Sequence, residues 1–271
     1  MKNSKFAYLN GRFVNLDSAQ VSIFDSSYLY GEGVFETLRV YNGKPAFADR
    51  HYSRLRRNAE ILGLSIAITS DSWPTILEEL LIRNSTKDAA IRATFSRENI
   101  SIFCKPVDIN PALYSKGASL LLVDDLHNDS GTIAGIKSTN YLTQRLARAC
   151  AERAGAYEAL LRNGQGHWVE GSKTNFFIIR NEKIITPPLD EGLLPGITRE
   201  VLLEILKEKK ILFEEKIILD IDLQQASEIF LTGTLTEVMS VSTLSGRIDR
   251  TLPVGPTSKK LLRAYRSRIN S

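Results

Sequence analysis

The chain has 271 residues, of which 43% are hydrophobic and 24% are charged, and its formal net charge is +4. These values are ordinary for a globular protein, and the length allows one large core or two modest domains. Basic and acidic residues are interspersed, no apolar run reaches the roughly 18 residues of a membrane span, and the N-terminal segment does not resemble a signal peptide. We therefore expect a soluble, cytoplasmic protein without a nucleic-acid or membrane partner.

Strands dominate the first part of the expected fold. Two short apolar runs around Asn10-Gly11 are typical of a β-hairpin, and residues 33–47 predict a strand that turns at Asn42-Gly43. The period of two in that strand places Phe35, Thr37 and Arg39 on one face. Glu36 lies on the other face, among apolar residues. Further expected elements are helices at about 49–62 and 72–84, and strands at 89–97, 100–107 and 117–125.

A polar, glycine-containing stretch, residues 124–135, is typical of a linker. Beyond it we expect helices at about 139–154, 198–210 and 222–227 and a closing helix in the last 15 or so residues. The strands expected between them are 156–161, 166–170, 174–179, 183–186, 213–218 and 228–232. The pattern predicts an α+β (mixed α/β) chain of two lobes, with a small N-terminal α/β domain at 1–123, the linker at 124–135 and a larger C-terminal domain at 136–271.

Two charged residues in the second half are candidates for chemistry. Lys137 follows the linker directly; such a lysine is usually a solvated surface charge, but a desolvated one can form a Schiff base. Glu170 lies in WVEGSKTNFFII, between apolar runs, so it is either an exposed turn carboxylate or the partner of a protonated ring nitrogen. The two cysteines and three histidines lack metal-binding spacing, and we expect no metal site.

Two turns could bind an anion. Pro195-Gly196 leads into a helix that begins near Thr198, where the backbone N–H groups of Ile197 and Thr198 could hold a phosphate. Thr234 belongs to a second turn rich in hydroxyl groups, at the end of a buried strand. Either turn could equally be an ordinary connection between elements, with no role in binding.

The order and spacing of these features resemble the class IV aminotransferases, the fold-type IV pyridoxal phosphate enzymes. The matching motifs are GEGVFETLRVYNG, HYSRLRRNAEILGL, Lys137, VEGSKTNFF, LPGITRE and LTGTLTEV. The family includes branched-chain aminotransferases, D-amino acid aminotransferases and aminodeoxychorismate lyases. The resemblance extends from YLNGRFV to about residue 245, which is nearly the whole chain.

The resemblance implies a cofactor, a set of site residues and an assembly. The cofactor is pyridoxal 5′-phosphate, held in a larger β-barrel-like C-terminal lobe. Lys137 forms the Schiff base with it and moves the proton between Cα and C4′, and Glu170 pairs with the pyridinium nitrogen. The phosphate is held by Arg54, Gly196, Ile197, Thr198 and Thr234, and the phenolic oxygen is contacted by Tyr141. The active site is completed across a homodimer.

The motifs leave the substrate open. Candidates for the substrate-facing wall are Phe35, Thr37, Arg39, Arg92 and Leu235, with Arg92 or Arg39 available to a carboxylate. Branched-chain enzymes usually read FEGIR where this chain reads FETLR, and the Arg-x-His pair of D-amino acid aminotransferases falls on Ile102 and Cys104.

Lyases often carry the equivalents of Thr37 and Arg92 but lack that of Tyr141. Tyr141 and TGTLTEV favour an aminotransferase that acts on an amino acid, or related amine, and a 2-oxo acid. The alternative is an aminodeoxychorismate lyase that forms 4-aminobenzoate and pyruvate. A remote alternative is an inactive cofactor-binding homologue.

Overall fold

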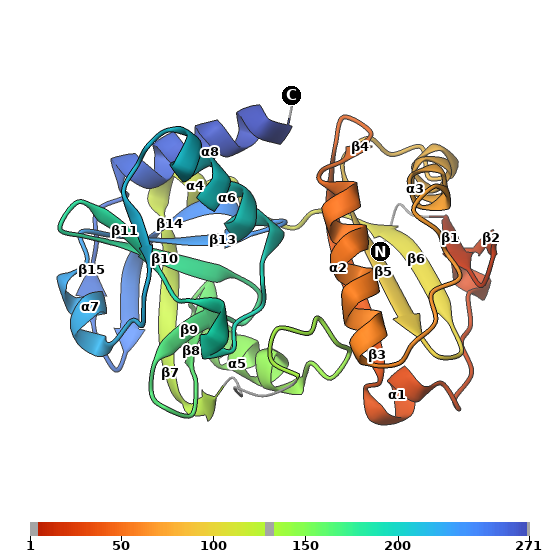
Figure 1. Ribbon diagram of the computed structural model, residues 1–271, viewed down its shortest axis with the longest axis horizontal. Coiled ribbons are helices and arrows are strands. Elements are labelled where there is room, and N and C mark those ends of the chain that lie inside the picture. The colour runs from red at the N-terminus through yellow and green to blue at the C-terminus, as the bar shows by residue number, and fades with distance from the viewer. Residues whose placement is uncertain (1–4, 128–132, 270–271) are drawn as a thin grey trace. The chain divides into compact units, whose positions relative to one another are not determined.

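The structure is a computed structural model that describes residues 5–127 and 133–269 (Figure 1). The chain forms two compact units. The first comprises Met1–Asp108 and Ile136–Tyr141, and the second comprises Ile109–Gly135 and Leu142–Ser271. The mixture of helices and sheets confirms the expected α+β class.

The division between the units differs from the expected domains 1–123 and 136–271. Strand β7 (Ala118–His127) pairs with two strands of the second unit, so it belongs there. Residues 136–141 instead join the first unit. Part of the expected linker, residues 128–132, lies outside the described residues.

An antiparallel six-stranded sheet forms the first unit, in the order β2-β1-β6-β5-β3-β4. Its strands are β1 (Phe6–Leu9), β2 (Arg12–Asn15), β3 (Gly33–Tyr41), β4 (Lys44–Pro45), β5 (Ala89–Ser96) and β6 (Ile100–Lys105). Its helices are α1 (Ser26–Tyr30), α2 (Ala48–Ile61) and α3 (Ser72–Arg83), with a 3-10 turn at Leu16–Ser18. Both expected hairpins, at Asn10-Gly11 and Asn42-Gly43, are present.

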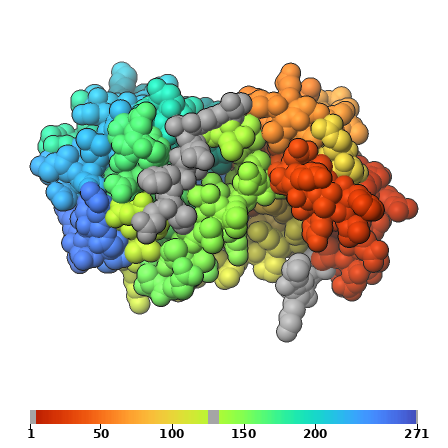
Figure 2. Space-filling model, turned by 90° about the horizontal axis from the view of Figure 1, so that it is seen from below, coloured from red at the N-terminus to blue at the C-terminus, as the bar shows by residue number. Residues whose placement is uncertain are grey.

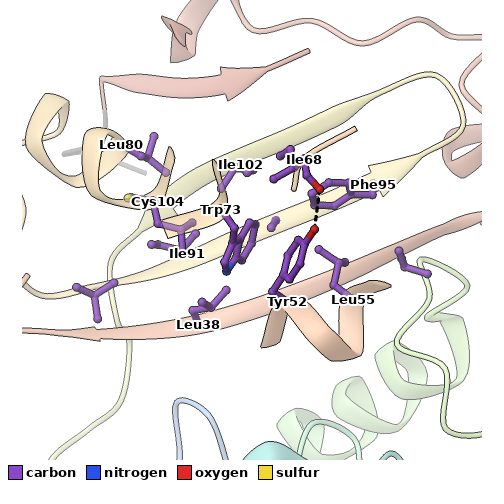
Figure 3. Packing of buried hydrophobic residues seen from close by; sticks show 14 of the residues in the cluster. Leu38, Tyr52, Leu55, Ile68, Trp73, Leu80, Ile91, Phe95, Ile102 and Cys104 are labelled. Atoms are coloured by element: carbon purple, nitrogen blue, oxygen red, sulfur yellow. Dashed lines mark hydrogen bonds between the residues drawn. The ribbon is translucent and has the colours of Figure 1, made fainter. Parts of the chain in front are cut away.

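The core of the first unit lies between the sheet and helices α2 and α3 (Figure 3). Leu38 from β3 and Ile91 from β5 are fully buried in it, as the period of two predicts for residues on the same side as Glu36. Tyr52 of α2 packs at 5.6 Å from the Trp73 ring of α3. Its hydroxyl donates a hydrogen bond of 2.7 Å to the carbonyl of Ile68, so the buried phenol is satisfied.

A mixed nine-stranded sheet forms the second unit, in the order β12-β11-β10-β13-β14-β7-β8-β9, with β15 paired to β14. Besides β7, its strands are β8 (Glu158–Arg162), β9 (Trp168–Gly171), β10 (Asn175–Arg180), β11 (Lys183–Thr186), β12 (Phe213–Glu215), β13 (Glu228–Gly233), β14 (Glu237–Gly246) and β15 (Arg250–Thr251). An isolated bridge between Trp168 and Ile218 joins β9 to the segment that follows β12. The two ends of the sheet therefore approach each other, as in the expected barrel-like lobe.

The helices of the second unit are α4 (Leu113–Lys116), α5 (Leu142–Arg153), α6 (Ile197–Glu208), α7 (Asp220–Gln225) and α8 (Pro256–Ile269), with a 3-10 turn at Leu189–Glu191. Helices α6 and α8 contact each other and strand β13, and α8 also packs along β14 (Figure 1). Among the residues that the structure describes, no helix has the length and apolar character needed to cross a bilayer.

Candidate active site

Lys137 lies on a short segment that pairs with the beginning of β3. Its carbonyl accepts a hydrogen bond of 2.8 Å from the N–H of Phe35, and the N–H of Thr139 donates one of 2.7 Å to Gly33. A side chain at Gly33 would place its Cβ only 2.9 Å from the Thr139 hydroxyl, so glycine permits this close approach. The backbone of Lys137 is thereby fixed on the sheet of the first unit.

Phe35 brings three predicted site residues together. The Lys137 ammonium lies 4.6 Å from the centre of the Phe35 ring, and the Arg92 guanidinium carbon lies 3.3 Å from it. The Tyr141 ring meets Phe35 edge-on at 5.5 Å. An aromatic face attracts cations, so this buried ring holds two positive groups near one another. Arg92, which is distant in the sequence, thus shares one face of the first unit with Lys137 and Tyr141.

Arg92 is a cationic side chain that could bind an anionic ligand. It faces Thr37 in the register of β3 and β5, and its Nε donates to the Thr94 hydroxyl at 3.1 Å. Burial lowers the pKa of Arg92 to about 10, so the guanidinium is charged at neutral pH. Among the side chains that the structure describes, no carboxylate forms an ion pair with it. A substrate carboxylate could supply that missing counter-charge.

Arg39 is engaged elsewhere. Its guanidinium forms an ion pair with Asp88, donates to the carbonyls of Val40 and Ala89, and stacks over Tyr41 at 4.5 Å. It shares the strand face of Phe35, but these contacts hold it at the far end of β3. The structure therefore favours Arg92 over Arg39 as the cation next to Lys137.

Arg54 belongs to a buried charged cluster with Glu36 and His51. Its Nε and Nη2 donate to the two Glu36 oxygens at 2.7 and 2.8 Å, and His51 Nδ1 lies 2.7 Å from the same carboxylate. Burial alone would raise the pKa of Glu36, but the Arg54 and His51 partners outweigh it and hold that pKa well below its usual range. Burial lowers the pKa of His51. The cluster fixes the orientation of Arg54, which is the predicted phosphate ligand.

This cluster was not predicted from the sequence. The period of two places Glu36 on the apolar face of β3. This position could have predicted a cationic partner, because a buried carboxylate requires one. The HYSR motif, which begins 15 residues after Glu36, supplies both partners from one face of α2.

We expect Glu36→Gln to lower the free energy of unfolding by about 3 kcal/mol, because the Arg54 charge would remain buried without its counter-charge. The measurement is the shift in the urea midpoint. Glu79→Gln is the control, since Glu79 forms an exposed pair with Arg83 on α3 and should cost less than about 1 kcal/mol. Equal shifts in the two variants would show that the buried cluster contributes no more than a surface pair.

Glu170 of β9 is buried in the second unit, with 8% of its surface exposed. The N–H of Leu194 donates to its Oε2 at 3.0 Å, and the Asn175 amide lies 3.4 Å from the same oxygen. The Asn175 amide also donates to the Leu194 carbonyl at 2.9 Å. These two neutral donors help to hold the carboxylate in place. Of the two alternatives that the sequence left open for Glu170, the structure therefore excludes an exposed turn carboxylate.

Asn175 also meets the loop before α6. A Cβ on Gly196 would lie 2.0 Å from the Asn175 side-chain oxygen, so no other residue fits there without movement. Asn175 therefore connects Glu170 to the beginning of α6. This role was missed in the sequence, where Asn175 is simply a residue of the expected strand 174–179.

The N-terminus of α6 offers backbone donors. Gly196 precedes the helix, and no side chain in the described part of the chain caps it. The first-turn N–H groups, including those of Ile197 and Thr198, lie at the positive end of the helix dipole. The Thr198 hydroxyl lies 3.3 Å from that of Tyr265 on α8. Burial raises the pKa of Tyr265 to about 12, so its hydroxyl keeps its proton at neutral pH.

A second set of donors lies at the tip of the β13–β14 hairpin, residues Thr234–Thr236. The hairpin closes at the pair Gly233 and Glu237, and the backbone N–H groups of Leu235 and Thr236 have no acceptor in the part of the chain that the structure describes. Thr232, just before the tip and opposite Asn175, has a buried hydroxyl without a partner there.

These residues fit pyridoxal phosphate. The uncapped helix, the hairpin tip and the orphaned hydroxyl are donors suited to a phosphate or carboxylate, and the buried Glu170 carboxylate is suited to a protonated ring nitrogen. In the described residues no group of three or more His, Cys, Asp or Glu side chains could hold a metal ion.

Comparison with known proteins supports the same assignment. Residues 33–244 match the model of the amino-transferase class IV family. The chain is 35% identical to a putative branched-chain-amino-acid aminotransferase of Methanocaldococcus jannaschii, over 96% of this chain and 94% of the relative. It is 31% identical to a D-alanine aminotransferase of Staphylococcus aureus, over 97% and 98% of the two chains.

Among solved structures, the chain resembles the branched-chain aminotransferase of Thermoproteus uzoniensis with norvaline. The TM-score is 0.89 at 30% identity, and the match covers 97% of this chain and 94% of that one. The match to the family model and the similarity over nearly full length confirm the predicted family and fold. The chain belongs to the class IV aminotransferases, and it is a pyridoxal-phosphate-dependent enzyme.

Proposed function

We propose that this aminotransferase moves an amino group between an amino acid and a 2-oxo acid, and that Arg92 holds a substrate carboxylate beside Lys137. The observation that carries the proposal is the grouping of Lys137, Arg92 and Tyr141 around the buried Phe35 ring. Arg92 supplies a fixed cation, and every amino acid and 2-oxo acid supplies a carboxylate.

Bound pyridoxal phosphate supplies the electron sink for the reaction. Lys137 would bind the cofactor covalently, and its amine would take the proton from Cα and return it at C4′. Glu170, held by Leu194 and Asn175, keeps the ring nitrogen protonated. Gly196, Ile197, Thr198 and Thr234 offer donors to the phosphate, with Arg54 as a further cation, and Leu235 and Thr37 contact substrate.

A panel of half-reactions tests the proposal. Loss of the cofactor's absorbance band would be followed with L-branched-chain amino acids, D-alanine, L-glutamate and (R)-amines, each as sole donor. We expect at least one amino acid to convert the cofactor and a 2-oxo acid to restore it. Release of pyruvate from aminodeoxychorismate, with no donor active, would instead show the lyase. Thr37 and Arg92 are compatible with the lyase, but the two sequence relatives reported above are named aminotransferases.

We further propose that the enzyme is a homodimer located in the cytoplasm. The first unit exposes an apolar patch over α1 and the segment before it, which is coloured red in Figure 2 and lies at the surface. Exposed patches of this kind mark interaction sites, and a second copy of this chain fits the assembly implied by the family resemblance. The patch consists of Val21, Ile23, Phe24, Tyr28, Leu29 and Tyr30. Fractionation of the cells that make the protein tests its location.

We expect Phe24→Ser to convert the dimer to monomers, because Phe24 is 76% exposed, so its replacement should affect contacts between molecules rather than the core. Sedimentation velocity should give twice the chain mass of 30.3 kDa for the unaltered protein and the single mass for the variant. Leu212→Ser is the matched control, since Leu212 is 70% exposed in the second unit and lies outside the patch. A dimer that survives Phe24→Ser would exclude the patch as its interface.

A further inference from the structure

Glu237, directly after the hairpin tip, has an unusual backbone conformation. Its φ is 56°, in the left-handed region that glycine and asparagine tolerate far better than glutamate, although it begins a strand. Only 4% of its surface is exposed, so the conformation is not a fluctuation of a free loop. A strained residue beside donors that face a ligand is typical of a site that must hold one geometry.

Side chains from α8, from α4 and from the turn before β8 hold this residue and its neighbour. Arg266 of α8 donates to one Glu237 oxygen through Nε at 3.0 Å and through Nη2 at 2.5 Å. The Arg266 guanidinium stacks over the Tyr114 ring of α4 at 5.0 Å, and the Tyr114 hydroxyl donates to the Thr236 carbonyl at 3.3 Å. The Tyr157 hydroxyl lies 3.2 Å from that of Thr236.

Helix α8 therefore supports both sets of donors. Tyr265 contacts Thr198 at the beginning of α6, and the next residue, Arg266, holds Glu237 at the hairpin. Because these are adjacent residues of one helix, the two donor sets share a single rigid support. Neither side chain belongs to the residues proposed to touch ligand.

We infer that Arg266 is a positioning residue: by holding Glu237 in its left-handed conformation, it aims the N–H groups of Leu235 and Thr236 at the anionic group of the ligand. That group is a carboxylate of the substrate or the phosphate of the cofactor. The inference rests on the proposed function, since it assigns the hairpin tip to that same site.

The test compares Arg266→Met with Arg268→Met. Arg268 lies on the same helix and pairs with Glu204 and Glu208 of α6, away from the hairpin. In Arg266→Met holoenzyme we expect about a tenfold rise in either the KM of the amino donor or the dissociation constant of pyridoxal phosphate, with kcat within about twofold. Arg268→Met should change neither constant. The constant that rises identifies the anion.

A rescue separates positioning from general stability. Asparagine adopts the left-handed conformation at little cost, so Glu237→Asn in the Arg266→Met protein should restore the affected constant. The inference is overturned if Arg266→Met lowers only the thermal midpoint, or if the double variant shows no recovery. Absence of amino transfer in the unaltered protein would contradict the proposed function, while the cofactor-affinity measurement would still test Arg266.

Discussion

Lys137→Ala is expected to abolish turnover and the covalent link to the cofactor. Loss of proton transfer alone should lower kcat by about 10²–10⁴-fold, and loss of the covalent link should lower kcat further. The fold should persist, because Lys137 pairs with Phe35 through its backbone carbonyl, which alanine retains. Borohydride reduction followed by peptide mass spectrometry should find the cofactor on Lys137 in the unaltered protein and on no residue of the variant.

Lys105→Ala is the control for this experiment. Lys105 is also partly buried in the first unit, and burial lowers its pKa, so its replacement reproduces the general cost of removing a partly buried amine. It should retain the covalent link. Normal turnover in Lys137→Ala would remove Lys137 from the mechanism altogether.

Glu170→Gln should retain the cofactor and its colour but lose on the order of 10²–10³-fold in kcat, because a neutral amide cannot hold the ring nitrogen protonated. The amide oxygen can still accept the Leu194 N–H, so little structural change is expected. Single-turnover kinetics would measure the chemical step, and absorbance would report the bound cofactor.

Glu228→Gln provides the matched control. Glu228 is as buried as Glu170, at 7% against 8% exposed, and also accepts backbone N–H groups, those of Thr257 and Ser258. Its replacement should affect stability rather than kcat. If Glu170→Gln behaves in the same way, Glu170 is a structural carboxylate and the assignment to the ring nitrogen is wrong.

The sequence predicted the family, the cofactor and the fold class because these depend on motif order and hydrophobic period. The period of two in β3 separated Phe35 from Glu36 correctly, since alternation follows from strand geometry alone. The structure gives the positions of the individual site residues, whereas the roles assigned to them remain predictions.

What the sequence did not provide were partners in space. Glu36 and Arg54 are 18 positions apart, and Arg39 and Asp88 are 49 apart, so only the packing of α2 and the pairing of β3 with β5 reveal these contacts. The domain boundary differed for a related reason. An apolar run such as that of β7 indicates a buried strand but not which sheet contains it, and β7 pairs with β14, more than 100 residues later.

The segment that carries Lys137 has a consequence for synthesis of the chain. Residues 136–141 complete the first unit, but the chain on either side of them belongs to the second. While a ribosome makes the protein, the first 108 residues emerge well before Lys137, and the edge of β3 at Gly33 and Phe35 lacks the backbone partners that residues 137 and 139 later supply. An open strand edge favours pairing with other chains. This part of the β3 edge therefore stays open in the nascent chain until residues 137 and 139 have been translated.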